Sequence, residues 1–543
     1  MSYAIVCSDL TFSHPDGTPV LDGLDAAFGT GRTGLIGVNG SGKSTLLKLI
    51  AGELRPVSGT VDVRGAVGYL PQDLVLDGTA TVSDLLGITA ARTALHAIER
   101  GGATEENFAA VGDDWDVEER ARAELDRLGL AHLGLDRPVP TLSGGEAVLT
   151  GLAALFLARP AVLLLDEPTN NLDVDARRRL YDAVDSWTGV LVVVSHDREL
   201  LDRVDAIADL RDGAVRTFGG TLTAYEDLLA VEREAAERAV RTAETDVRRQ
   251  KRELAEAHVK LARRKRYGNK MYEQKREPKI VMGARKREAQ VSAGKHRIMH
   301  EGRLADARAR LDEAEELVRE DAEIRIALPA TAVPAGRTIV TVTGLTAPDP
   351  VPGTLTELIV RGPERIALVG PNGSGKTTLL RALVGEAVPD GMEVEIGVQG
   401  VRYLPQRLDV LDEDLTVAEN VHRHAPDASP NEIRAGLARF LFRGARADQR
   451  AGTLSGGERF RAVLASLLLA DPAPRLLLLD EPTNNLDLAS ARQLAEALSA
   501  YRGALIVVSH DLRFLRTLDI TRRLHLDRAT GLTEGEPMDE LMR

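Results

Sequence analysis

The feature that most constrains the fold is an internal repeat that divides the 543 residues into two halves. Residues 37–44, GVNGSGKS, return 333 positions later as residues 370–377, GPNGSGKT. Four further motifs return in the same order, namely YLPQ (69–72 and 403–406), LSGGE (142–146 and 454–458), DEPTNNLD (166–173 and 480–487) and SHD (195–197 and 509–511). Because a chain of this length holds more than one core, the repeat predicts two similar domains.

Each half alternates short apolar runs with amphipathic segments, which is typical of an α/β domain with a doubly wound parallel sheet. The runs predict buried strands at 35–36, 162–165, 190–194, 366–369, 476–479 and 505–508. Helices are expected at 45–51 and 378–384. The first half also has about 22 extra residues between its YLPQ and LSGGE motifs, within a polar, Ala-rich stretch at 85–126 that we expect to be helical.

The first repeated motif predicts a phosphate-binding loop between a strand and a helix in each half. Its glycines let backbone N–H groups converge on phosphates, its lysine reaches the β/γ oxygens, and its hydroxyl binds magnesium. An ordinary glycine turn is the alternative for a single copy, and two copies in the same context disfavour it. The candidate binding residues are Gly37, Asn39, Gly40, Ser41, Gly42, Lys43, Ser44 and Thr45, with Gly370, Asn372, Gly373, Ser374, Gly375, Lys376, Thr377 and Thr378.

An aspartate followed by a glutamate ends one apolar strand in each half. Asp166 and Asp480 can hold magnesium through water, and Glu167 and Glu481 are placed to polarise the attacking water as general bases. A helix N-cap is the alternative for such a pair. The phosphate-binding loop in the same half favours the catalytic interpretation.

The Leu-Ser-Gly-Gly-Glu motifs resemble the signature of the ATP-binding cassette (ABC) superfamily. A Ser-Gly-Gly before a helix offers N–H groups to a γ-phosphate, although it also serves as a simple helix cap. With the motif order, the resemblance covers both halves and implies two cassettes paired head to tail in a monomer. ATP on Lys43 would then be closed over by Ser455, and ATP on Lys376 by Ser143. The implied signature contacts are Ser143, Gly144, Gly145, Ser455, Gly456 and Gly457.

The resemblance implies further roles, and it predicts an ATPase that uses ATP and Mg²⁺ at two composite sites. His196 and His510 match the switch histidines that contact the γ-phosphate, and Gln72 and Gln406 match the glutamines that sense magnesium and water. The implied metal ligands are Ser44, Gln72, Asp166, Thr377, Gln406 and Asp480.

Two departures from the family pattern weaken the symmetry between the halves. Phe12 stands where such cassettes place an aromatic ring that stacks on adenine, and the region around 344–346 offers no such ring. Arg461 lies six residues after Ser455, where the first half has Leu149. We therefore expect the two sites to differ in adenine affinity.

Heptad spacing predicts an antiparallel helical hairpin between the halves. Apolar residues recur every seven positions at 240, 247, 254 and 261, and again at 304, 311 and 318, with a break expected at Gly268, Pro278, Gly283 and Gly294. We expect the arm over 229–262 to reach roughly 50 Å. The predicted organisation is a first nucleotide-binding domain at 1–225, a hairpin linker at 226–330 and a second nucleotide-binding domain at 331–543.

Charge is distributed unevenly along the chain, whose net charge is -13. Residues 248–300 hold 18 Lys or Arg against five Asp or Glu, and eight of the 11 lysines lie in this segment. At the hairpin tip, Arg263 to His296, 12 basic residues face three acidic ones, with Tyr267 and Tyr272 among them. A solvated helix face is the alternative, but the shortage of acids at the tip favours contact with a phosphate backbone, and RNA in particular.

Tandem cassettes with a basic linker resemble the ABC-F family of ribosome-associated ATPases. The resemblance implies that the tip reaches ribosomal RNA and tRNA, and that the protein is a translation factor or protects ribosomes from antibiotics. The alternatives are the ATPase subunit of a drug exporter, which gives the hairpin no role, and a coiled-coil DNA-repair ATPase. The second is disfavoured because Cys7 is the only cysteine, which excludes a zinc hook.

Targeting and membrane signals are not apparent in the sequence. The first nine residues lack the pattern of a secretory signal. The most apolar stretch, 151–165, is interrupted by Arg159 and Pro160 and is too short to span a bilayer. We expect a cytoplasmic protein without a membrane span.

Overall fold

The computed structural model describes residues 4–15, 17–72, 79–170, 172–211, 213–273, 298–300, 302–313, 329–406, 410–484 and 486–535. The chain forms two compact units. One comprises residues 1–222 with 324–543 and holds both cassettes, and the other comprises residues 223–323. The finer division into domains at 1–225, 226–330 and 331–543 stays a prediction.

The first cassette is built on a six-stranded sheet with the order β5-β6-β7-β3-β8-β9. Its first five strands pair in parallel, and β9 joins β8 antiparallel. The strands of this cassette are β1 (Ile5–Ser13), β2 (Pro19–Phe28), β3 (Gly31–Ile36), β4 (Ser58–Val63), β5 (Val67–Leu70), β6 (Val162–Asp166), β7 (Val190–Val194), β8 (Ala206–Arg211) and β9 (Ala214–Gly219). The predicted parallel α/β core is confirmed.

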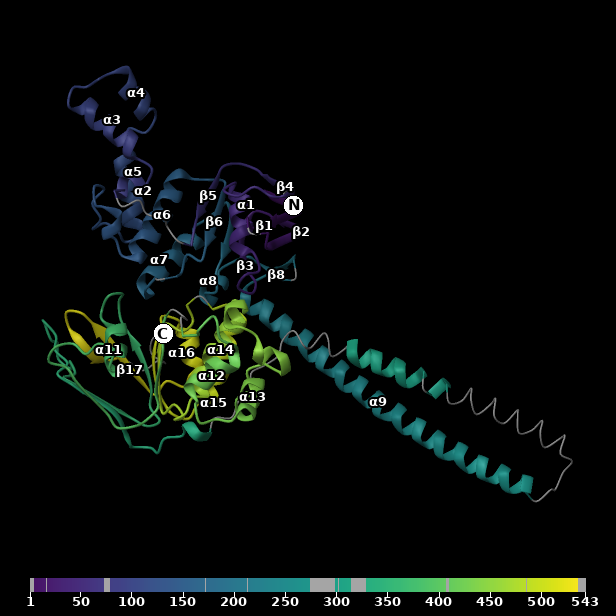
Figure 1. The fold of residues 1–543 in the computed structure, drawn as a ribbon. Helices are drawn as coiled ribbons and strands as arrows, with labels where there is room; N and C mark the ends of the chain where they lie inside the picture. The colour runs from purple at the N-terminus through teal and green to yellow at the C-terminus, as the bar shows by residue number, and fades with distance from the viewer. Residues whose placement is uncertain are drawn as a thin grey trace. The chain divides into compact units, whose positions relative to one another are not determined.

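Helices of the first cassette connect these strands and include the extra residues of this half (Figure 1). They are α1 (Lys43–Ala51), α2 (Val82–Leu85), α3 (Thr89–Glu99), α4 (Glu105–Val111), α5 (Val117–Arg127), α6 (Gly144–Ala158), α7 (Val174–Asp185) and α8 (Arg198–Leu201). The stretch at 85–126 is largely helical, as predicted, because α3, α4 and most of α5 lie within it.

The second cassette repeats this architecture in the order β14-β15-β16-β12-β17-β18. Its strands are β10 (Thr338–Thr343), β11 (Glu357–Arg361), β12 (Arg365–Val369), β13 (Glu393–Ile396), β14 (Val401–Leu404), β15 (Leu476–Asp480), β16 (Ala504–Val508), β17 (Arg522–Asp527) and β18 (Gly531–Glu534). Its helices are α11 (Lys376–Leu383), α12 (Val417–His424), α13 (Pro430–Arg439), α14 (Gly456–Leu468), α15 (Leu488–Ala500) and α16 (Leu512–Thr517).

Each cassette also has a three-stranded antiparallel sheet, which the sequence did not lead us to expect. The orders are β2-β1-β4 and β11-β10-β13. Along β1 buried and exposed residues largely alternate, so Ile5, Cys7 and Leu10 face a core that they share with Leu46 and Leu47 of α1. A sheet with only one buried face has a weaker sequence signal than the continuous apolar runs of the parallel strands.

The unit of residues 223–323 contains two helical segments that pack side by side (Figure 1). The long helix α9 (Leu222–Glu273) lies beside a helical segment at 302–313. Val247 is buried against Leu304 and Ala307, and Leu254 and Leu311 pack on the same cluster. The heptad seam is therefore confirmed where the structure describes it.

The bounds of α9 correct the expected break in the hairpin. The helix continues through Gly268 to Glu273, because a single glycine lowers helix stability by only about 1 kcal/mol. The other three expected break positions, at 278, 283 and 294, lie outside the described residues. So does most of the basic tip, from residue 274 onward.

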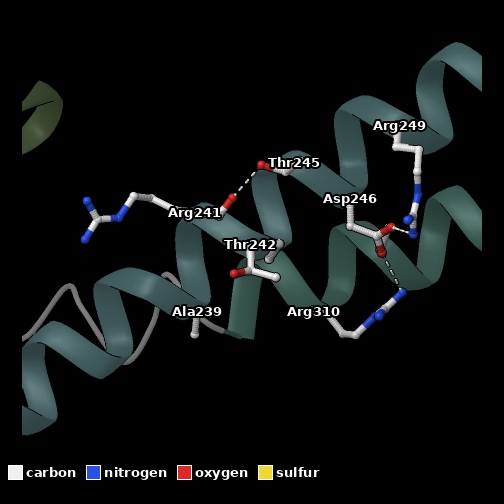
Figure 2. A pocket seen from close by; sticks show the side chains of 9 residues that line it. Ala239, Arg241, Thr242, Thr245, Asp246, Arg249 and Arg310 are labelled. Atoms are coloured by element: carbon white, nitrogen blue, oxygen red, sulfur yellow. Dashed lines mark hydrogen bonds and ion pairs between the residues drawn. The ribbon is translucent and has the colours of Figure 1, made fainter.

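A charged cluster bridges the two helical segments of this unit (Figure 2). Asp246 of α9 accepts a hydrogen bond from Arg310 Nη2 at 3.0 Å and pairs with Arg249 one turn away on its own helix. These side chains line a hollow of about 840 Å³, together with Arg241 and small residues. Asp246 thus fixes the pairing of the helices beside the apolar contact of Val247.

Candidate active sites

Loops at the carboxyl ends of three adjacent strands build a candidate site in each cassette. In the first cassette the order β6-β7-β3 places residues 166–173, 195–197 and 37–44 at one edge of the sheet. In the second cassette the order β15-β16-β12 does the same for the matching motifs. Ligands of open α/β sheets bind at such an edge.

The phosphate-binding loop of the first cassette leads from β3 into α1. A Cβ at Gly37, where φ is 152°, would lie 2.5 Å from the carbonyl oxygen of Leu210, so only glycine fits. Lys43 Nζ folds back and donates to the carbonyl oxygens of Gly37 at 2.8 Å and Val38 at 3.1 Å. Among the described residues, the buried hydroxyl of Ser41 has no hydrogen-bond partner. An amine and a hydroxyl in this setting fit a phosphate group.

The second cassette reproduces this loop between β12 and α11. A Cβ at Gly370 would lie 2.0 Å from the carbonyl oxygen of Leu526. Lys376 Nζ donates to the carbonyl oxygens of Gly370 at 2.7 Å and Pro371 at 2.9 Å. The hydroxyl of Ser374 is likewise buried without a hydrogen-bond partner in the part of the chain that the structure describes. Burial lowers the pKa of both loop lysines.

An aspartate is the last residue of β6 and of β15, the strands that end near the phosphate-binding loops. Asp166 accepts hydrogen bonds from Ser44 Oγ at 3.0 Å and from the Tyr69 hydroxyl at 3.3 Å. Burial raises the pKa of Asp166. In the second cassette Asp480 accepts from the Tyr403 hydroxyl at 3.1 Å. A carboxylate and a hydroxyl 3.0 Å apart are oxygen ligands of the kind that Mg²⁺ prefers.

The glutamates that follow these aspartates are buried and face His196 and His510, the predicted switch histidines. Glu167 Oε1 lies 3.2 Å from His196 Nε2, and Glu481 Oε1 lies 3.3 Å from His510 Nε2. Burial raises the pKa of each glutamate to about 7. Burial also lowers the pKa of His196 to about 3 and that of His510 to about 4, so both rings are neutral at pH 7. A carboxyl poised near neutral pH suits a general base.

A cleft of about 460 Å³ brings many of the predicted residues of the first site together. The predicted residues that line it are Asn39, Gly40, Gly42, Lys43, Ser44, Thr45, Gln72, Glu167 and His196. Gln406, the counterpart of Gln72, is exposed after β14.

Phe12, the predicted adenine-stacking residue, does not line this cleft. Its ring is only 8% exposed and packs in the core between β1 and β2. His14 lines the cleft instead, and its ring meets the edge of Phe12 at 5.7 Å between centroids. Phe12 lies within β1 and is buried, whereas His14 directly follows the strand and is exposed.

The serines of the two signature motifs cap the helices that follow them. Ser143 Oγ accepts from the Glu146 N–H at 3.2 Å, and Glu146 accepts from the Ser143 N–H at 2.7 Å. Ser455 and Glu458 form the same box on α14, at 3.4 Å and 3.1 Å. The helix-cap and phosphate interpretations are therefore compatible, since the cap fixes the first turn whose N–H groups point outward.

Contacts join the first phosphate-binding loop to the second cassette. The Asn39 N–H donates to Asp487 Oδ2 at 3.1 Å. A Cβ at Gly456 of the second signature would lie 3.3 Å from Asn39 Cβ. The signature of one cassette thus lies beside the loop of the other. Asp487, the last residue of its DEPTNNLD motif, was not among the predicted site residues. Because Asp173 ends the matching motif in the first half, the repeat could have indicated both aspartates as site residues.

The Arg461 departure has a structural counterpart. Arg461 is mostly buried, and its guanidinium lies over the Phe442 ring, 5.9 Å from the centroid. Burial lowers its pKa. Leu149 at the matching position is buried in the first cassette. The two cassettes therefore differ behind their signatures.

Known proteins match this chain within both cassettes. A family model described as ABC transporter matches residues 23–170 and 356–484, which is half of the chain. A relative from Arabidopsis thaliana, named ABC transporter F family member 2, is 30% identical over 544 residues, covering 94% of this chain and 73% of that protein. The chain belongs to the ABC-F family. It is accordingly an ATPase with two ATP-binding cassettes.

Other ABC-F relatives match nearly the whole chain. The tylosin resistance ATP-binding protein TlrC of Streptomyces fradiae is 34% identical over 561 residues, covering 96% of each chain. The probable ATP-binding protein YheS of Escherichia coli K12 is 31% identical over 558 residues, covering 96% of this chain and 78% of that protein.

Solved structures support the same fold. The RNase-L inhibitor superposes with a TM-score of 0.54 at 19% identity, covering 98% of this chain and 90% of that chain. This likeness confirms the fold of two cassettes. Among the helices that the structure describes in this ABC-F chain, none combines the length and apolar character needed to cross a membrane.

Proposed function

We propose that this ABC-F protein is a ribosome-binding ATPase that modulates translation or protects the ribosome from antibiotics. ATP held between the cassettes at two composite sites would favour the bound form, and hydrolysis would release it. The supporting observation is the Asn39–Asp487 contact, because it links the loop of one cassette to the other, as a shared nucleotide site requires. The name of the S. fradiae relative, which records tylosin resistance, agrees with the protective role.

In each site the loop lysine and the signature serine of the opposite cassette would contact the γ-phosphate. Lys43 with Ser455, and Lys376 with Ser143, are the pairs implied by head-to-tail packing in a monomer. His14 would take the place next to adenine in the first site that Phe12 was expected to occupy, since it lines the cleft.

Magnesium would be held by the oxygen groups opposite the loop. Ser44, Asp166 and Gln72 would serve in the first site, and Thr377, Asp480 and Gln406 in the second. The Ser44–Asp166 distance of 3.0 Å and the presence of Gln72 in the same cleft support this donor set. The bound ion would neutralise charge on the β/γ-phosphates.

Glu167 and Glu481 would accept the proton of the attacking water. Each faces a neutral histidine, His196 or His510, which is able to hydrogen-bond the γ-phosphate without competing for that proton. Both glutamates have a left-handed backbone, with φ of 48° and 46°, which is a strained conformation of the kind found at active sites.

The basic tip, Arg263 to His296, would contact ribosomal RNA and tRNA. Its 12 basic residues against three acidic ones support this assignment. The sign and density of the charge suit a phosphate backbone, and Tyr267 and Tyr272 suit stacking on unpaired bases.

Ribosome pelleting of the double variant Glu167→Gln with Glu481→Gln tests the proposal. With ATP present, this variant should sediment with ribosomes, because the nucleotide stays uncleaved. A matched Lys43→Ala, Lys376→Ala variant should stay in the supernatant, because it lacks the phosphate contacts. Failure of the double glutamine variant to sediment with ribosomes in the presence of ATP would contradict ribosome binding.

Deletion of residues 263–296 separates this proposal from the exporter alternative. A ribosome-binding protein should no longer pellet with ribosomes and should keep its basal ATPase, because the cassettes are intact. An exporter subunit should keep its efflux function after the same deletion.

A further inference from the structure

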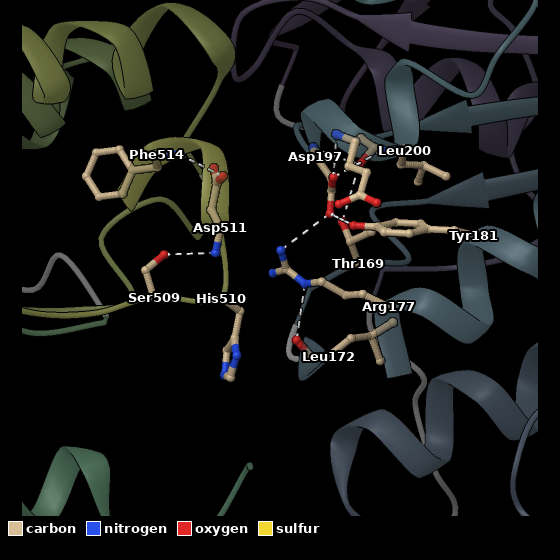
Figure 3. A network of polar contacts seen from close by, with 12 residues as sticks. Thr169, Leu172, Arg177, Tyr181, Asp197, Leu200, Ser509, His510, Asp511 and Phe514 are labelled. Atoms are coloured by element: carbon tan, nitrogen blue, oxygen red, sulfur yellow. Dashed lines mark hydrogen bonds and ion pairs between the residues drawn. The ribbon is translucent and has the colours of Figure 1, made fainter. Parts of the chain in front are cut away.

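Arg177 of α7 binds the loop after β7, and its guanidinium points toward the second cassette (Figure 3). Its side chain is only 13% exposed. Its Nε donates to the carbonyl oxygen of Leu172 at 3.2 Å, and its Nη1 donates to Asp197 Oδ2 at 3.4 Å. Asp197 directly follows His196, the switch histidine of the first site.

The Asp197 carboxylate does not depend on this arginine. It accepts a 2.7 Å hydrogen bond from the Tyr181 hydroxyl, and its other oxygen caps α8 by accepting from the N–H groups of Glu199 at 2.9 Å and Leu200 at 3.1 Å. The bond from Arg177 is the longest of these hydrogen bonds. Since a guanidinium has five N–H groups, Arg177 has donors beyond those that hold it to its own cassette.

The remaining face of the guanidinium turns toward the second cassette. In Figure 3 it points toward His510 and Asp511, which follow β16. The charge of Arg177 acts on both Glu481 and His510. The first cassette thus contributes a buried cation to the surroundings of the catalytic pair Glu481–His510.

The groups that surround this pair come from several elements of both cassettes. Lys376 from α11, Asp480 from β15 and Arg177 from α7 act on Glu481. Lys376, Arg177 and Asp173 act on His510. Of the cations named for Glu481 and His510, Arg177 belongs to the first cassette.

The position that matches Arg177 in the second cassette carries no arginine. Arg177 is the fourth residue after Asp173, which caps α7, and the fourth residue after Asp487, which caps α15, is Ala491. The counterpart of the Arg177 guanidinium is therefore the methyl group of Ala491. This difference is independent of the Arg461 and Leu149 exchange.

We propose that Arg177, a residue of the first cassette, is a positioning residue for the second site and orients Glu481 and His510 for hydrolysis. At the same time it binds Asp197, in the loop that carries His196 of the first site. The inference rests on the proposed function, because it takes Glu481 as the base. It makes the link between the sites directional, from the first site to the second.

Single-site backgrounds test this role. Glu167→Gln leaves hydrolysis to the second site, and Glu481→Gln leaves it to the first. In the Glu167→Gln background, Arg177→Gln should lower kcat about tenfold and leave the KM for ATP within about twofold, because positioning acts on the chemical step. Arg177→Lys should recover about half of the missing rate or more, since it keeps the charge.

Tyr181→Phe is the matched control, because it removes the shorter bond to Asp197 and keeps the guanidinium. It should leave kcat at the second site unchanged. If Tyr181→Phe reproduced the drop in kcat, or if Arg177→Gln slowed the first site as much as the second, Arg177 would be a structural support of the loop, and the inference would be wrong.

The inference and the proposed function fail separately. Normal turnover in the Glu167→Gln, Glu481→Gln double variant would contradict the catalytic roles of Glu167 and Glu481. Loss of turnover in the double variant, with no response of the second site to Arg177→Gln in the Glu167→Gln background, would contradict only the role of Arg177.

Discussion

At the scale of single residues, Glu167 and Glu481, the proposed general bases, combine burial with a backbone conformation that few non-glycine residues adopt. Glu481 has a φ of 46° and is 8% exposed. Its carboxyl is placed by the fold before any nucleotide binds. Removal of this group should therefore affect both catalysis and stability, in opposite directions.

Removal of the base should slow hydrolysis strongly. We expect Glu167→Gln and Glu481→Gln, combined in one chain, to lower the ATPase rate by about 10² to 10⁴, the usual contribution of a positioned proton acceptor. Phosphate release measured at saturating ATP checks this. An ATPase rate within twofold of the wild-type rate would show that neither glutamate acts as the general base.

The same substitution should stabilise the protein in the absence of nucleotide. The pKa of Glu481 is about 7 in the folded protein and lies above its usual range, so the folded state binds more protons than the unfolded state as pH rises from about 4.5 to 7. Stability is lost across that window, and the cost is fully present above pH 7. Glu481→Gln should thus gain roughly 1–3 kcal/mol at pH 8 and nothing near pH 4.

Thermal unfolding at several pH values measures this effect. Substitution of the exposed Glu99 by Gln serves as the control and should give no pH-dependent difference. A Glu481→Gln variant that was no more stable than the wild type at pH 8 would show that burial of the ionised carboxyl does not lower the free energy of unfolding.

The tyrosines of the YLPQ motifs should influence magnesium use. Tyr403→Phe removes the hydroxyl that donates to Asp480 at 3.1 Å, and one hydrogen bond contributes about 1 kcal/mol. We expect the Mg²⁺ concentration for half-maximal hydrolysis to rise by up to about tenfold in the Glu167→Gln background. An unchanged magnesium titration would show that Asp480 is oriented without the tyrosine.

Motif spacing predicted the residues that share a strand end or a loop, and it missed those that meet only through packing. Lys43, Asp166 and Glu167 lie at the carboxyl ends of adjacent parallel strands, where sequence motifs are informative. Arg177 depends on the direction of a helical side chain, which the sequence does not show. The motif position also did not show that Phe12 is buried in the core while His14 lines the cleft.

At the scale of elements, the hairpin is held by a small apolar seam. Leu304 is 8% exposed and packs on Val247 and Ala307. Leu304→Ala should destabilise the helix pair by about 2–3 kcal/mol, because it leaves a cavity that two helices only partly fill. Hydrogen exchange of the amides in α9 should therefore become faster near Val247.

The matched control for this prediction is Val259→Ala on the same helix. Val259 is 52% exposed, so its truncation removes little buried surface. Equal exchange rates in both variants would contradict the seam.

Heptad periodicity predicted this element well, because two long helices pack mainly through their seam. Gly268 shows the limit of the method, since a glycine inside a stable helix does not end it.

At the scale of the whole molecule, the net charge of -13 conceals a segment of opposite sign. Between 248 and 300 the chain carries 18 basic and five acidic residues. Ribosome binding by the glutamine double variant should therefore weaken steeply with salt. Six or more phosphate contacts would lower the affinity by about 10³ or more between 50 and 200 mM salt.

A charge-reduced hairpin gives the control for this salt dependence. Replacement of Lys265, Lys270, Lys275 and Lys279 by Gln should reduce the slope of log affinity against log salt by about 0.7–0.9 for each phosphate that a lysine no longer neutralises. The cassette ATPase should be unchanged. A slope equal to that of the parent would place the RNA-binding surface elsewhere.

The continuity of α9 through Gly268 has a mechanical consequence. A helix of 52 residues is about 80 Å long at 1.5 Å per residue. Such a rod converts an angle into a distance, so a tilt of about 5° at its first turn moves the far end by about 7 Å. That distance is about two stacked bases, at 3.4 Å each. A helix that ended before Gly268 would be only about 70 Å long and would move its end correspondingly less.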